Sequence, residues 1–219
     1  IFSFNPDSPL LFTQFYFWAF LAVVYIIFAL IGNRRMMRNI FLFLVSLFFY
    51  FKTSGFSVLI LLFVTVSDFL IAKRIDRAKT EASRKGWLAL SIILDLSILC
   101  YFKYAYFVAD FIRSLTGLEI KVTDIFSQIG NMIAGKETFN VDAIVLPVGI
   151  SFFIFQVISY SVDVYRKEIK PVRNILDFGF YVSFFPQLVA GPIVKASEFI
   201  PQLYKPFHLG RRQFGIAVF

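Results

Sequence analysis

The sequence predicts an all-α, polytopic membrane protein. Of its 219 residues, 58% are hydrophobic and 16% are charged, and phenylalanine alone occurs 31 times. A soluble domain has about a quarter of its residues charged and is less apolar. The charged residues also cluster between long apolar runs. Several of these runs are long enough to cross a bilayer. A single soluble core cannot bury this much apolar surface, so we expect the outer surface to face lipid.

Five apolar runs are predicted to span the membrane, at about residues 11–32, 39–51, 56–72, 87–112 and 143–165. The first contains 22 residues without a charge. The second has only 13 residues, which is short for the hydrocarbon core, so this helix should be tilted or lie in a thinned region. Apolar residues at helical spacing within 113–142 predict an amphipathic segment outside the membrane.

Basic residues set the predicted topology. The loops at 33–38, 73–86 and 166–173 hold three, six and four Lys or Arg residues. Such loops are typical of the cytoplasmic side. The segment 113–142 and the N-terminus should then be external. Although the net charge is +8, the basic residues cluster between apolar segments, which argues against a nucleic-acid partner.

Four polar residues of the fifth run share one helix face. Gln156, Ser159, Tyr160 and Asp163 stand at positions i, i+3, i+4 and i+7. Unpaired polar groups are costly in hydrocarbon, so this face should point to the protein interior. It is either a hydrogen-bonding seam between helices or the lining of a hydrated substrate path. The residues alone favour the seam.

Prolines and glycines interrupt two of the apolar segments. Pro147 and Gly149 begin the fifth run, where Pro147 suits a helix start or a kink and Gly149 permits close packing. The stretch FFPQLVAGPI, within 174–194, predicts a broken or re-entrant helix. We expect Pro186 to end one helical piece, Gly191 and Pro192 to bend the chain again, and Gln187 to bind carbonyls freed by the break.

Other polar residues have simpler interpretations. Lys103 should extend to the outer interface, and Asp68 should form an ion pair at the cytoplasmic edge. Asp95 lies deeper and is harder to explain. Cys100 is expected to be a small buried or lipid-facing residue, and His208 an ordinary loop residue. The sequence contains no nucleotide-binding loop, metal-ligand cluster or nucleophile motif, so no metal or bound cofactor is predicted.

Three motifs, DLSILCYFKYAYF, LPVGISFFIFQVISYSVDVYR and FFPQLVAGPI, occur in this order. Together they resemble the membrane-bound O-acyltransferase (MBOAT) family, in particular its branch of bacterial alginate O-acetyltransferases. The resemblance implies part of a ring-like helix bundle around a thinned, funnel-like centre, with short, tilted and re-entrant helices. It also implies a multi-pass protein of the bacterial inner membrane.

The resemblance implies transfer of an acetyl or similar acyl group to a polysaccharide or cell-wall hydroxyl outside the cytoplasm. The donor would be acetyl-CoA or an acyl carrier protein on the cytoplasmic side, and a periplasmic or extracellular transferase would be a further partner. The funnel or substrate path would be lined by the four polar residues of the fifth run and by Gln187. The alternative is a transporter or scaffold without catalytic activity.

The family's essential histidine lies in a Trp-His motif in the second half of its members. No residue of this sequence matches that motif, and the chain resembles the N-terminal half only. The catalytic histidine is therefore expected beyond Phe219. On this interpretation, the 219-residue chain by itself is inactive.

Overall fold

The computed structural model describes residues 15–32, 34–119, 121–135, 141–142, 144–192 and 194–205. Throughout these residues the regular structure is helical, without strands, which confirms the all-α class. The first residues of the first predicted span, parts of the segment 113–142, and Ile193 and His208 lie outside the described residues.

The helices follow the apolar runs of the sequence. They are α1 (Phe15–Ile31), α2 (Arg35–Ser54), the short 3-10 helix η1 (Gly55–Ser57), α3 (Val58–Arg77), α4 (Glu81–Thr116), α5 (Ile125–Ala134), α6 (Ile150–Tyr165), α7 (Ile175–Ser183), α8 (Phe185–Ala190) and α9 (Ala196–Leu203). Two helical stretches, Arg35–Arg77 and Glu81–Thr116, are long and apolar enough to cross a membrane. Together with the shorter apolar helices α1 and α6, they support the membrane character of the chain.

Local sequence signals explain where several helices begin and end. The turn between α2 and α3 is made at Gly55, whose φ of 58° is accessible to glycine at little cost. Thr80 caps α4 by accepting a hydrogen bond from the amide of Ser83, and Asp124 caps α5 by accepting from Phe126 and Ser127. These caps satisfy amides that have no partner within the first turn of a helix.

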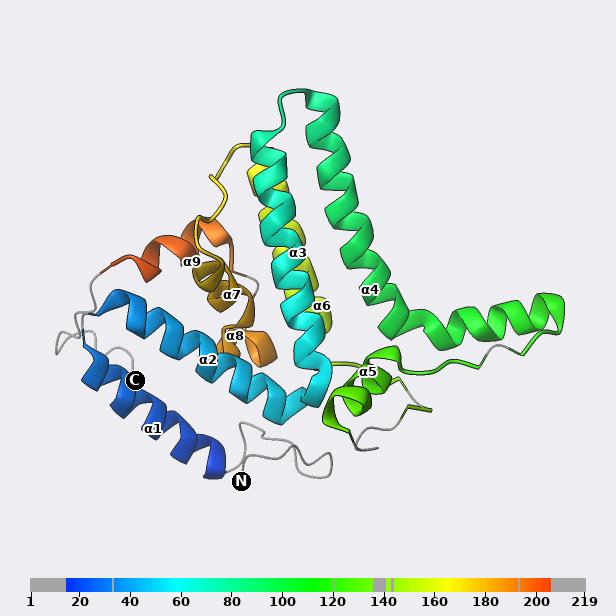
Figure 1. Cartoon of the computed structure of the whole chain (residues 1–219), viewed down its shortest axis with the longest axis horizontal. Helices are drawn as coiled ribbons and strands as arrows, with labels where there is room; N and C mark the ends of the chain where they lie inside the picture. The colour runs from blue at the N-terminus through cyan, green and yellow to red at the C-terminus, as the bar shows by residue number, and fades with distance from the viewer. Residues whose placement is uncertain are drawn as a thin grey trace.

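The main hydrophobic core lies where α3, α4, α6 and α7 pack together. Figure 1 shows α3 beside α4, with α6 behind α3. α4 then bends, and its C-terminal part runs away from the other helices (Figure 1). α5 lies near the turn between α2 and α3 and contacts η1.

A second part of the fold is built on α2. This helix packs against α1 on one side and against α7 on another, as Figure 1 shows. Phe17 of α1, Phe49 of α2 and Phe185 of α8 form a small aromatic cluster between these helices. α7 also contacts α3 and α9, so it joins the two parts.

Candidate functional site

The segment with the two prolines is a helix broken into two pieces. α7 ends at Ser183, Phe184 leaves helical geometry with ψ of 105°, and α8 begins at Phe185. Pro186 therefore lies in the first turn of α8, and the expectation that it ends a helix was wrong. A continuous helix would drive the proline ring against the carbonyl of Val182, whereas in a first turn the missing amide costs nothing.

The start of α6 packs directly on α8. Gly149, at the N-terminus of α6, has a φ of 73°, and a Cβ atom added there would lie 2.4 Å from the carbonyl oxygen of Leu188. This distance is far below van der Waals contact, so only glycine fits. The contact brings the motif LPVGI against FFPQLVAGPI, although the two are remote in the sequence.

Gln187 and Gly191 hold the end of α8. The Nε2 atom of Gln187 donates to the carbonyl of Pro192 at 3.2 Å, and the amide of Gly191 donates to the carbonyl of Gln187 at 2.8 Å. A Cβ atom on Gly191 would come within 2.7 Å of the Cα of Gln187. Gln187 thus binds the carbonyl of a residue that follows α8, and the bond holds the chain in the turn after the helix.

The polar face of α6 meets the backbone of the broken helix and of the loop before it. The side chain of Gln156, 1% exposed, donates through Nε2 to the carbonyl of Tyr181 at 3.0 Å. The hydroxyl of Tyr160 accepts from the amide of Val172 at 2.9 Å. Asp163 is buried and Ser159 is half-buried. For Gln156 and Tyr160, these contacts are those of a packing seam.

A polar cluster that the sequence analysis missed lies among α2, α7 and α9. Both oxygens of the Asp177 carboxylate accept hydrogen bonds, from Asn39 Nδ2 at 2.9 Å and from the Tyr204 hydroxyl at 2.7 Å. Partial burial and this hydrogen bond to Asp177 raise the pKa of Tyr204 to about 12. The Arg35 guanidinium lies over the Tyr204 ring, 5.0 Å from its centre. A lone acid in the apolar run NILDFGFY was the only sequence signal for this cluster.

A cleft of about 850 Å³ opens next to this cluster. Its walls come from the end of α1, the first half of α2, α7 and α9. Aromatic side chains, including Phe28, Phe180 and Phe199, form much of the lining. Arg38 and Lys205 contribute positive charge, and Glu198 contributes one negative charge. Arg38 is buried and donates to the carbonyls of Leu203 and Lys205, so it ties α2 to the end of α9.

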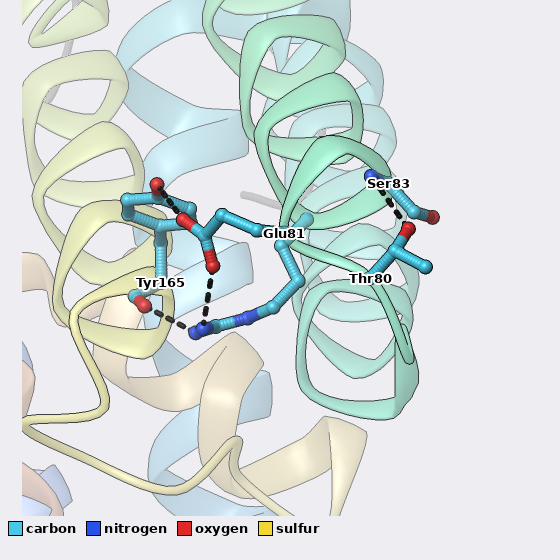
Figure 2. A network of polar contacts seen from close by, with 5 residues as sticks. Thr80, Glu81, Ser83 and Tyr165 are labelled. Atoms are coloured by element: carbon cyan, nitrogen blue, oxygen red, sulfur yellow. Dashed lines mark hydrogen bonds and ion pairs between the residues drawn. The ribbon is translucent and has the colours of Figure 1, made fainter.

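At the tip of the α3–α4 hairpin, Glu81 and Arg84 of α4 contact the last residue of α6. Figure 2 shows Tyr165 beside Glu81, with the tyrosine hydroxyl donating to the carboxylate. Arg84 forms an ion pair with Glu81 at 3.5 Å and donates to the backbone carbonyl of Tyr165. Thr80 caps the helix beside this network. The network fastens α4 to α6 at the end of the bundle that carries the most basic loop.

The structure corrects the expectation for Asp68. Its carboxylate is fully buried and accepts hydrogen bonds from Ser91 and Ser161, and no ion pair to it is recorded among the described residues. Asp95 is also fully buried. Lys103 and Cys100 are exposed on the surface of α4.

The chain is similar in sequence to several bacterial proteins that have names. Over 88% of its length, the chain is 33% identical to a probable alginate O-acetylase, AlgI, of Pseudomonas aeruginosa, covering 34% of that protein. It is 37% identical to AlgI of Azotobacter vinelandii over 66% of the chain and 26% of that relative. Over 94% of the chain and 42% of the relative, it is 30% identical to a peptidoglycan O-acetyltransferase of Helicobacter pylori.

The chain is related to bacterial O-acetyltransferases. These relatives confirm the resemblance to the alginate O-acetyltransferase branch of MBOAT proteins. The chain spans less than half the length of each of these relatives. No family model and no solved structure matches the chain.

Proposed function

We propose that this chain is part of a membrane-bound O-acetyltransferase. The enzyme transfers an acetyl group from a cytoplasmic donor across the membrane to a hydroxyl of an extracytoplasmic polysaccharide or of the cell wall. The observation that carries the proposal is similarity along nearly the whole chain to proteins named for O-acetylation of two different polymers, alginate and peptidoglycan. Both names describe the transfer of an acetyl group to a hydroxyl oxygen of a polymer.

The broken helix α7–α8 and the start of α6 form part of the wall of a central funnel. Irregular backbone at membrane depth is tolerated only where protein or a water-filled cavity surrounds it. The chain leaves helical geometry at Phe184, so its backbone is irregular there. The close approach of Gly149 to Leu188 packs the start of α6 against this irregular segment. Gln156, Ser159, Tyr160, Asp163 and Gln187 act in this wall, and Gln156 and Tyr160 do so mainly by holding the broken helix in place.

The cleft between α2 and α9 receives the acyl donor. It lies at the basic end of α2, which the charge distribution assigns to the cytoplasm. Acetyl-CoA and acyl carrier proteins both present a thioester on an anionic, phosphate-bearing arm. Arg38 and Lys205 provide positive charge for such a group, and the aromatic lining accommodates the apolar part of the arm.

The catalytic histidine is contributed by a part of the enzyme that this chain does not include, and the 219-residue chain alone is inactive. The full enzyme is a multi-pass protein of the bacterial plasma membrane with an external N-terminus. An acyl carrier protein on the inner side and a transferase on the outer side are its expected partners.

The test is an acetylation assay with the full-length protein. It is expressed in a bacterium whose own O-acetyltransferase genes are deleted, and ester-linked acetate is measured on secreted polysaccharide and on purified cell wall. We expect acetate on one of the two polymers, and none when residues 1–219 are expressed alone at equal abundance. A well-folded full-length protein that acetylates neither polymer would favour a transporter or scaffold.

A further inference from the structure

Two buried aspartates lie side by side between α3 and α4. Asp68 of α3 and Asp95 of α4 are both 0% exposed. Ser91 of α4 donates to Asp68, and Asp95 follows Ser91 by one helical turn on the same face of α4, which directs the Asp95 carboxyl toward Asp68. Ser91 and Ser161 complete the cluster, with the Ser91 hydroxyl 3.1 Å from that of Ser161. Three helices, α3, α4 and α6, therefore each contribute at least one oxygen-bearing side chain to one buried site.

Of the four carboxyl oxygens in this cluster, only one accepts a hydrogen bond from a described residue. The hydroxyls of Ser91 and Ser161 both donate to Oδ1 of Asp68. Among the residues that the structure describes, no donor reaches Oδ2 of Asp68 or either carboxyl oxygen of Asp95, although all three atoms are buried. Two ionised carboxylates only accept hydrogen bonds, so neither aspartate can satisfy the other. No ion pair with a Lys or Arg of the described ranges is recorded for either carboxylate.

We infer that Asp68 and Asp95 form a proton-binding site in which one proton is shared between the two carboxyl groups at neutral pH. The proton resides on Asp95 and is donated to Oδ2 of Asp68. It thereby gives a partner to one oxygen on each side chain and removes one of two like charges from the interior. Two carboxylates in contact cannot both remain ionised in such a place without a compensating cation.

The groups facing the pair do not supply that compensation. From α6, Ser161 and Tyr160 face the cluster, and the Tyr160 hydroxyl already accepts from Val172. From α4, Ser91 faces it. All three side chains are neutral: the two serine hydroxyls donate hydrogen bonds to Asp68, but none of the three carries a charge. The shared proton therefore links α3 to α4. Beside it, Ser161 links both helices to α6.

Infrared spectroscopy tests the site directly. The full-length protein is placed in lipid nanodiscs at neutral pH in sodium-free buffer, and the carbonyl stretch of protonated carboxylic acids is recorded. Wild type should show such a band, shifted by exchange into heavy water. The Asp95→Asn variant should lose the band and still fold, because its amide can donate to Asp68. Asp110→Asn, an exposed aspartate on the same helix, is the matched control and should retain the band.

Other outcomes overturn the inference. Absence of the band in wild type would mean that both groups are ionised. If sodium abolished the band, or raised the unfolding temperature of wild type but not of Asp95→Asn, the site would hold a metal cation instead. A band that persists unchanged in Asp95→Asn and in Asp68→Asn would belong to another carboxyl. If Asp95→Asn failed to fold, the wild-type spectrum alone, with and without sodium, would still decide between proton and cation.

Discussion

The carbonyl oxygen of Leu188 occupies the space that a side chain on Gly149 would need, only 2.4 Å from the position of a Cβ atom. Leu188 belongs to the broken helix, and Gly149 begins α6. This single contact joins two of the three motifs by which the chain resembles its relatives. Glycine at 149 therefore serves two purposes, a left-handed backbone conformation and a close approach between helices.

Replacing Gly149 by alanine should destabilise the protein more than an otherwise equivalent change elsewhere. Gly135 is the matched control, because its φ of 63° is similar and no atom of the described residues lies within 4 Å of the Cβ position. Both substitutions carry a conformational cost of about 1–2 kcal/mol. Gly149→Ala should cost about 1–3 kcal/mol more, because the added methyl displaces α8. Thermal unfolding of the full-length protein in detergent measures the difference, and equal losses would contradict the contact.

Local residue chemistry predicted part of this arrangement and could not predict the rest. The helical class follows from the apolar runs, and the two proline–glycine motifs indicated where the helices are interrupted. The sequence could not show that Asn39 binds Asp177, because the two are 138 residues apart and each is a single polar residue in an apolar run. Asp68 was misassigned for a related reason. Its nearness to a basic loop in the sequence suggested an ion pair, whereas packing turns it toward Ser91 and Ser161.

The break was also misplaced by a few residues. Proline excludes helix on its N-terminal side but is well accepted in a first turn, so a sequence with Pro186 is compatible with a break before or at the proline. The position at Phe184 is favoured by packing, since Phe185 then enters the aromatic cluster with Phe17 and Phe49. Such a choice depends on partners that are distant in the sequence.

Gln156→Ala should lower stability and acetyl transfer together. The substitution removes the donor to the buried carbonyl of Tyr181, and an unsatisfied buried group costs about 1–3 kcal/mol. Ser97→Ala is the control, because Ser97 donates to the Ile93 carbonyl of its own helix on an exposed surface. It should change the free energy of unfolding by less than about 0.5 kcal/mol. Folded yield and acetate transferred are measured on the same preparations. If transfer fell while yield and stability were unchanged, Gln156 would line the substrate path.

Tyr204 should lose its proton at a higher pH than an ordinary tyrosine. Its hydrogen bond should stabilise the fold across the neutral and mildly alkaline range. Its pKa is raised to about 12 by partial burial and by the bond to Asp177, whereas tyrosine in an unfolded chain ionises near about 10. The hydrogen bond contributes fully below pH about 10. Its contribution falls as the pH rises from there through about 12, because the unfolded chain ionises first.

Subtracting the alkaline absorbance titration of Tyr204→Phe from that of wild type isolates this one phenolate. The difference should have its midpoint near pH 12. The stability difference between the two proteins should shrink over the same interval. A midpoint near the ordinary value for tyrosine would show that the Asp177–Tyr204 contact is not maintained in the membrane protein.

The last prediction concerns topology, which follows from the distribution of basic residues and is open to a direct test. Lys79 lies in the most basic loop, and Glu119 lies beyond the end of α4, where its side chain is 76% exposed. Each is replaced by cysteine in a Cys100→Ser background, which removes the chain's single cysteine. An impermeant thiol reagent should label residue 119 in cells whose outer envelope has been permeabilised. It should label residue 79 only after the plasma membrane is also opened, because basic loops remain on the cytoplasmic side.

Replacing Glu119 removes only an exposed ion pair with Arg113, worth less than about 1 kcal/mol, so the fold should tolerate the change. The reverse labelling pattern would place the α2–α9 cleft outside the cell and would remove it as the site of a cytoplasmic acyl donor.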